Sequence, residues 1–296
     1  KSLLRHKRAV SAPTDFGPDS SFHRLLWDDA EVLKNEKIKL VPDEKIRRVV
    51  VPGFFPHGVA VRLQRKGVRV AVAAGELFPE RAVKRPDELR QIREAQQAAV
   101  IAMRAAVEMI AASKPDSAGF LALKGKRLTA DSVRRAITRV LLDHDCLSRE
   151  TIVAGGMQAV DPHEVGSGPL RAHEAIVIDI FPQHQAHGYW GDLTRTVVKG
   201  VAPASLRTMY HAVKAAQAAA LNCVRAGART NSVHRAAVEE FERRGFKTEV
   251  VEGKGSGFVH GTGHGVGLAI HEAPSVGLAK GRLKAFAVVQ AMPDEG

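Results

Sequence analysis

The feature that most constrains this chain is a pair of acidic residues placed in or beside apolar, strand-like sequence. Asp179 follows the run Ala-Ile-Val-Ile at residues 175–178, and Asp192 follows Gly-Tyr-Trp-Gly at residues 188–191. A carboxylate in such a segment is costly to bury unless a positive group compensates its charge. A metal ion is the simplest compensating group, so both acids are candidate metal ligands.

A second segment, at residues 260–274, supplies three imidazoles: His260, His264 and His271. Carboxylates and imidazoles together are donors that Mn²⁺, Co²⁺ and Zn²⁺ accept. The glycines that alternate through this segment do not fit the G-x-G-x-x-G nucleotide motif, and no P-loop Lys-Ser/Thr pair follows them. Alternating glycines more often permit close approach of the backbone to another group, here a metal or a substrate.

The first part of the chain, residues 1–83, is predicted to form a small α/β domain. A short strand is expected at residues 47–51. A β-hairpin is expected from residues 59–64 and 68–73, which are joined by a short turn that contains glycine.

The rest of the chain, residues 84–296, has a repeated order of predicted elements. Pro86 opens a long helix that Lys114-Pro115 stops, and Thr129 is the expected N-cap of a second helix. Three strand-like runs, two further helices and more strand-like sequence follow, at residues 151–154, 175–181, 189–198, 203–225, 232–244 and from 247 onward. This order predicts two similar halves whose sheets face one another, with helices packed outside.

Together these segments resemble the pita-bread metallopeptidase family of Xaa-Pro aminopeptidases, prolidases and methionine aminopeptidases. Its first hallmark reads Gly-Tyr-Trp-Gly-Asp-Leu-Thr-Arg-Thr at residues 188–196, after Asp179. Its second reads His-Gly-Thr-Gly-His at 260–264, followed by His-Glu-Ala-Pro at 271–274. The resemblance covers roughly residues 84–291. It implies an α+β pita-bread fold with pseudo-two-fold halves, preceded by a smaller creatinase-like α/β domain at residues 1–83.

The resemblance also implies a metal centre and a reaction. In the family, two Asp, one His and two Glu residues hold two divalent metal ions. By motif, Asp179, Asp192 and His264 match ligands of such a pair, formed by Mn, Co or Zn. The implied reaction is hydrolysis of the bond before proline at the amino terminus of a peptide or dipeptide, by a water that the metals activate.

Three other histidines match family positions around the substrate rather than at the metals. They are His163, His260 and His271, which could donate hydrogen bonds to the substrate carbonyl or the tetrahedral intermediate. A hydrogen-bonded structural role is the alternative for each of them.

The sequence departs from the family pattern near its end. Met292 stands where a Glu ligand is expected, and its neutral thioether cannot supply the charge of a carboxylate. The later Glu would fall beyond Gly296. The domain at 84–296 is therefore expected to be incomplete at its carboxy-terminal end and impaired as an enzyme, unless Asp294 or Glu295 substitutes.

Two alternatives remain at this level. One is a metal-free, creatinase-like hydrolase, which the missing Glu residues favour and the retained Asp179, Asp192 and His264 disfavour. The other is an inactive homologue that acts as a protein- or RNA-binding module.

Composition bounds the partners and the location. The net charge of +12 arises from Lys and Arg scattered along the chain, and aromatic residues are only 5%. These features disfavour nucleic acid as the main partner and are typical of charge that serves solubility. The peptide or dipeptide substrate is what the resemblance implies. No apolar run approaches the ~20 residues of a membrane span. Cys146 and Cys223 are too few for a disulfide framework, so a cytoplasmic protein with reduced thiols is expected. A homodimer is also expected.

Overall fold

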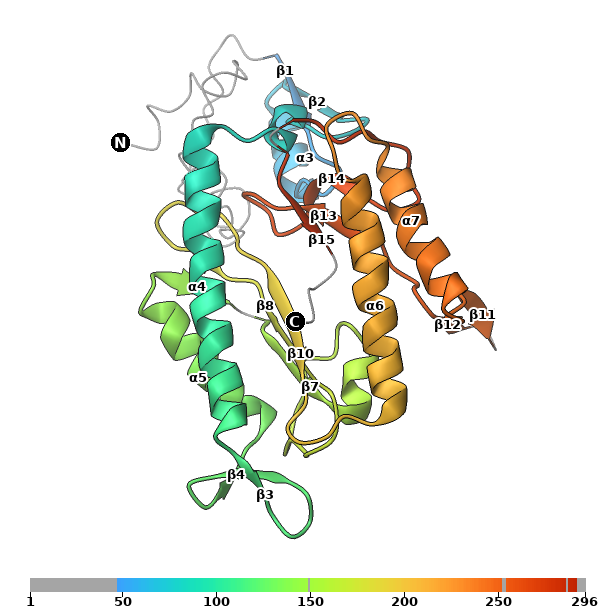
Figure 1. Cartoon of the computed structure of the whole chain (residues 1–296). Coiled ribbons are helices and arrows are strands. Elements are labelled where there is room, and N and C mark those ends of the chain that lie inside the picture. The colour runs from blue at the N-terminus through green and yellow to red at the C-terminus, as the bar shows by residue number, and fades with distance from the viewer. Residues whose placement is uncertain (1–46, 149, 252–253, 286, 292–296) are drawn as a thin grey trace. The chain divides into compact units, whose positions relative to one another are not determined.

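The computed structural model describes residues 47–148, 150–251, 254–285 and 287–291 (Figure 1). The chain divides into two compact units, Lys1–Arg81 and Ala82–Gly296. Among the helices that the structure describes, none combines the length and the apolar character needed to cross a bilayer.

The described part of the first unit is a parallel strand pair with a helix between its strands in the sequence. β1 (Arg48–Val51) pairs with β2 (Arg69–Val72), and α3 (His57–Arg65) joins them. The strands predicted at 47–51 and 68–73 are confirmed as β1 and β2, but the predicted hairpin is wrong, because residues 59–64 lie in α3. Parallel strands need a crossover connection, usually a helix, and the four-residue spacing of Val59 and Leu63 suits one helix face.

The second unit begins with a helix pair and a sheet. α4 (Pro86–Ala111) and α5 (Ala130–Leu142) form where the sequence predicted helices, and they pack against one another. The Thr129 hydroxyl caps α5 by accepting a hydrogen bond from the N–H of Ser132 at 3.1 Å. Beside them lies an antiparallel sheet in the order β10 (Leu193–Val197), β8 (Ile176–Ile180), β7 (Ile152–Gly155).

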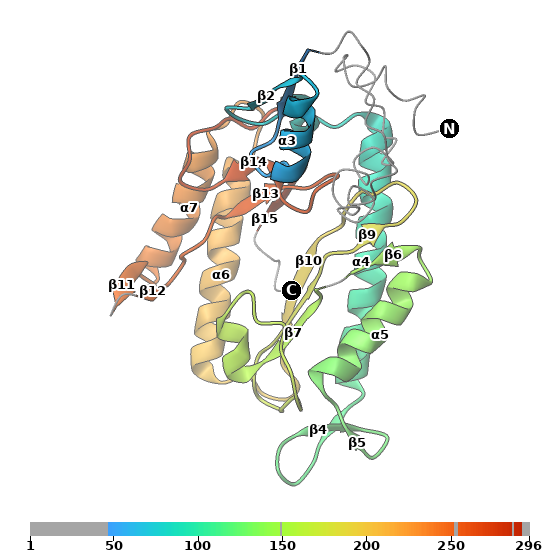
Figure 2. The same ribbon diagram turned by 180° about the vertical axis from the view of Figure 1, so that it is seen from behind.

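The same plan recurs in the later part of this unit. α6 (Ala204–Cys223) packs against α7 (Thr230–Arg243). The accompanying antiparallel sheet has the order β14 (Glu272–Val276), β13 (Gly263–Gly265), β15 (Val289–Ala291). The two helix pairs lie on opposite sides of the unit with the strands between them (Figures 1 and 2). The repeated plan agrees with the predicted α+β fold with two similar halves.

Shorter elements complete the described chain. They are η3 (Pro79–Ala82), β3 (Lys114–Pro115), β4 (Leu121–Leu123), β5 (Lys126–Arg127), β6 (Cys146–Leu147), η4 (Gly156–Val160), β9 (Gln183–His184), β11 (Glu249–Val251) and β12 (Lys254–Ser256). β6 pairs with β9, which places the turn after β9 next to α4 (Figure 2).

The alternation of β8 decides where its acid lies. Ile176, Ile178 and Ile180 are fully buried in the core that α4 and α5 form with the sheet. Successive side chains of a strand point to opposite faces. Asp179 therefore lies on the face opposite this core, where a polar group can meet other partners.

The segment before β10 approaches α4 very closely. A Cβ atom on Gly191 would lie 2.6 Å from the carbonyl oxygen of Ala95 in α4. Backbone atoms on both sides leave no flexible side chain to yield, so only glycine allows this approach.

We expect Gly191→Ala to lower the free energy of unfolding by about 1–3 kcal/mol, as overpacking typically does. Urea denaturation measures the change. Gly277→Ala is the matched control, because the nearest atom to its added Cβ, the Cα of Gly261, lies at 3.7 Å. Equal stability of the two variants would show that the contact between this segment and α4 is not tight in solution.

Candidate active site

Strand pairing brings the two predicted acidic ligands to one face of the first sheet. Asp179 of β8 lies opposite Thr194 of β10, and the Thr194 hydroxyl donates to Asp179 Oδ1 at 2.5 Å. Asp192 precedes Thr194 by two positions, so alternation directs it to the same face. Its own N–H donates to Oε1 of Gln96 at 2.8 Å, which fixes it to α4. Asp192 lies immediately before β10 rather than within the longer strand expected at 189–198.

The second sheet supplies the imidazoles. His264 of β13 has its Nε2 atom 3.5 Å from Oδ2 of Asp192. Its Nδ1 atom lies 3.2 Å from the carbonyl oxygen of Gly265. In the tautomer that donates this hydrogen bond, Nε2 keeps a lone pair, which is the usual state of a histidine poised to bind a metal.

Burial and mutual repulsion shape the charge of the two acids. Asp192 is 7% exposed, and burial, with the charge of Asp179 second, raises its pKa to about 7. Burial also raises the pKa of Asp179, against the hydrogen bond from Thr194 and the influence of His271. Burial lowers the pKa of His264, which favours the neutral ring. A divalent cation would relieve this repulsion, so the donors suit a metal in both chemistry and charge.

The three predicted metal ligands, Asp179, Asp192 and His264, nevertheless do not all converge on one point. Asp192 and His264 meet, whereas Asp179 is linked to Thr194. Among the described residues, another group of three has its ligand atoms within 4.8 Å of one another. It consists of Glu94, His184 and His187. The assignment of Asp179, Asp192 and His264 as one ligand set therefore stays a prediction. Met292, Asp294 and Glu295 lie outside the described residues.

The three predicted substrate-side histidines have different surroundings. The ring of His271 packs edge-on against that of His264, with centroids 4.2 Å apart. His260 approaches the Gly261 carbonyl oxygen through Nδ1 at 2.8 Å and packs against Phe258. The side chain of His163 is 94% exposed, so this conformation does not bring it to the acids. Their roles stay predictions.

A buried ion pair beside His271 was missed at the sequence level. Lys84 Nζ donates to Oε1 of Glu272 at 2.7 Å, and their side chains are only 1% and 9% exposed. The N–H of Ala269 donates to the other oxygen of Glu272 at 3.2 Å. The pair joins the start of the second unit to the strand that follows His271. Its partners are 188 positions apart, so no local pattern could reveal it.

The raised pKa of Asp192 predicts a pH-dependent stability in metal-free protein. Because this pKa is about 7 when folded and 3.8 ordinarily, the folded state binds the extra proton between these values. Binding of this proton contributes fully to the stability of the folded state below about pH 4, and the contribution is lost as the pH rises through about 7. The free energy of unfolding of Asp192→Asn, relative to that of the wild type, should therefore rise by about 2–3 kcal/mol from pH 5 to pH 8. Urea unfolding with a chelator present measures this, with the exposed Asp143→Asn as control. A difference that does not change with pH would contradict the shift.

Known proteins support the pita-bread comparison. The prolidase from Pyrococcus furiosus superposes with a TM-score of 0.69 at 23% identity, over 84% of this chain and 70% of that one. The X-Pro aminopeptidase from Thermotoga maritima gives 0.68 at 22% identity, over 88% of this chain and 68% of that one. At such identities the likeness shows the fold, which is the predicted pita-bread fold.

A different relative matches a shorter stretch. The 2-oxoglutarate dehydrogenase E1 component of Brucella anthropi is 43% identical over 99 residues, which are 32% of this chain and 10% of that protein. The chain thus spans about a tenth of the length of this curated relative.

The family itself is established by a match over most of the chain. The model of Metallopeptidase family M24 matches residues 90–294, which include both acids and all three histidines of the second segment. The chain belongs to Metallopeptidase family M24.

Proposed function

We propose that this chain is a metal-dependent peptidase that hydrolyses the bond before proline at the amino terminus of a peptide or dipeptide. The observation that carries the proposal is the meeting of the two sheets at Asp192 and His264, 3.5 Å apart and beside a second buried acid. The names of the structural neighbours, a prolidase and an X-Pro aminopeptidase, support proline as the specificity determinant.

The residues that would hold divalent metal ions are Asp179, Asp192 and His264. When bound, such ions make a water molecule more acidic and polarise the carbonyl that it attacks. The chain itself prepares the donors for this role. Thr194 orients the carboxylate of Asp179, and the Gly265 carbonyl holds His264 in one tautomer. Gln96 fixes the backbone of Asp192.

His271 is proposed to act on the substrate side of this centre. Its ring contacts His264 and it influences Asp179 electrostatically. It could therefore donate a hydrogen bond to the oxygen that gains negative charge during hydrolysis, as donors aimed at a developing oxyanion do. The buried Lys84–Glu272 pair would hold the strand that follows it in place.

The test is hydrolysis of Ala-Pro and Gly-Pro in the presence of Mn²⁺ or Co²⁺. We expect Asp192→Asn to lower kcat/KM by at least about 100-fold. Even the mutation of residues that only hydrogen-bond to metal ligands often lowers activity about 10–100-fold. Asp143→Asn, at an exposed position, should leave it unchanged. A chelator should abolish the activity, and added metal should restore it. Activity that persists in metal-free protein would instead favour the creatinase-like alternative.

A second substitution tests the proposed defect in the metal site. Met292→Glu restores a carboxylate at the position where the family resemblance expects one. We expect the variant to bind more Mn²⁺ or Co²⁺ than the wild type and to hydrolyse Ala-Pro faster, because more negative charge then holds the cations. Met292→Gln is the control that changes size and polarity without adding charge. If Met292→Glu matches this control in both measurements, position 292 does not contribute a ligand.

A further inference from the structure

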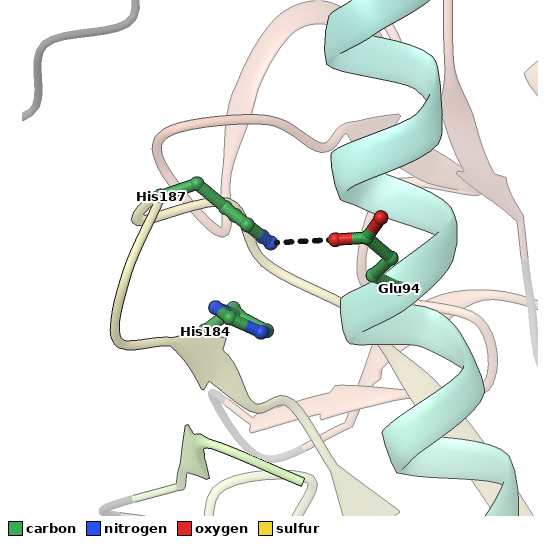
Figure 3. Close-up of side chains that lie close together, drawn as sticks. All are labelled: Glu94, His184 and His187. Atoms are coloured by element: carbon green, nitrogen blue, oxygen red, sulfur yellow. Dashed lines mark ion pairs between the residues drawn. The ribbon is translucent and has the colours of Figure 1, made fainter.

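A second group of side chains with metal-ligand chemistry combines two histidines of the segment that joins the two acids with a glutamate of α4. Glu94 of α4, His184 of β9 and His187 of the following turn lie close together, and His187 is directed at Glu94 (Figure 3). One ligand atom from each lies within 4.8 Å of the others. Nε2 of His187 is 3.4 Å from Oε2 of Glu94, and the two imidazole rings stack with centroids 3.9 Å apart.

The turn itself orients both rings. The N–H of Gly188 donates to the His184 carbonyl oxygen at 2.8 Å, which closes the turn. The N–H groups of Ala186 and Tyr189 approach Nδ1 of His184 and of His187, each at 3.2 Å. Nε2 is therefore the nitrogen of each ring that is left for a partner outside the turn.

The Nε2 atom of His187 has an unusual environment. It is buried, and within the described part of the chain it makes no hydrogen bond of acceptable geometry, although Glu94 is near. Buried polar atoms are nearly always satisfied, and an exception calls for an explanation such as an ion. The side chain of Glu94 is 51% exposed, so an ion could reach the group from solvent.

We propose that Glu94, His184 and His187 form a separate binding site for a Zn²⁺-class divalent cation. Two imidazoles and one carboxylate, with a fourth position open to water, are a donor set that zinc accepts. Tetrahedral bonds of 2.0–2.1 Å place neighbouring donors about 3.3 Å apart, close to the 3.4 Å between His187 and Glu94. The nitrogen-rich set differs from the carboxylate-rich set of Asp179, Asp192 and His264.

Binding requires a small rearrangement of the two rings. A cation takes the lone pair in the plane of each imidazole, so the stacked rings must open toward it. A neutral ring whose Nδ1 accepts a hydrogen bond carries its proton on Nε2. That proton must move to Nδ1 when the cation binds. The hydrogen bonds from the N–H groups of Ala186 and Tyr189 are then lost, but at 3.2 Å they are at the long end of the hydrogen-bond range.

The site would brace the loop between the two acids that are predicted to bind metal. Besides the Glu94–His187 contact, this loop is held to α4 by the Tyr189 hydroxyl, which donates to Glu88 at 2.7 Å. A cation at the proposed site would replace the weakest of these attachments with direct coordination. We therefore expect it to stabilise the loop, whatever reaction the chain catalyses.

The experiment is titration of the full chain with Zn²⁺ by calorimetry. The parent carries Asp192→Asn and His264→Gln, which weaken the other candidate centre. We expect about one equivalent of Zn²⁺ to bind the parent and to raise its melting temperature. Adding His184→Gln and His187→Gln should weaken binding at least tenfold and remove the thermal shift. Adding His211→Gln, at an exposed position of α6, should change neither.

A single exposed exchange tests the same site with less risk to folding. Glu94→Gln on the parent should also weaken binding, whereas Glu239→Gln, an exposed Glu of α7, should not. Circular dichroism without Zn²⁺ checks that each variant is folded. The proposal is overturned if the parent binds no Zn²⁺, if the paired His variant and the Glu94 variant bind as tightly as the parent, or if the controls lose as much affinity.

Discussion

The electrostatic cost of burying Asp192 beside Asp179 is the constraint on which the candidate site depends. Burial and the charge of Asp179 raise the pKa of Asp192 to about 7. A bound cation would offset both the burial and the repulsion between the two carboxylates. The fold accepts this cost because other parts hold both acids in place. Pairing of β8 with β10 sets Asp179 against Thr194, and α4 holds Asp192 through Gln96. The second sheet then brings His264 to within 3.5 Å of Asp192, so the candidate centre lies where the two halves of the unit meet.

Helix α4 has a larger role than its position outside the sheet suggests. One face buries a row of alanines, together with Met103 and Ile110, against the sheet and α5. Along its first half, Glu88, Glu94 and Gln96 each reach the loop that carries Tyr189, His187 and Asp192. The contact of Gly191 with Ala95 brings the two backbones together. The geometry of the acids is thus fixed from α4 as much as from the strands, and the proposed zinc site lies on the same connection.

Family membership and proposed activity rest on different observations. The family match covers residues 90–294, and the structural neighbours share the fold at low identity. Neither identifies a metal, and Met292 departs from the pattern that the resemblance implies. The match to a 2-oxoglutarate dehydrogenase E1 component covers a third of this chain and a tenth of that protein. The nature of the first unit as a creatinase-like domain stays a prediction, since the structure describes only residues 47–81 of it.

The sequence by itself determined the four long helices, the order of the second unit and the two motifs, because each depends on neighbouring residues. Helical periodicity, the Pro86 start and the Thr129 cap are local signals, and α4 and α5 begin where these signals place them. Residues 59–64 were predicted as a strand but form part of α3, because a short apolar run fits either structure. Only the parallel pairing of β1 with β2 requires a crossover connection such as a helix there. Tertiary structure alone decided the contacts between distant segments. Lys84 and Glu272 are 188 positions apart, and Asp192 and Gln96 are 96 positions apart. The gathering of Glu94 with His184 and His187 brings a turn to a helix face. No local pattern encodes such distances, because they follow from how the sheets and helices pack.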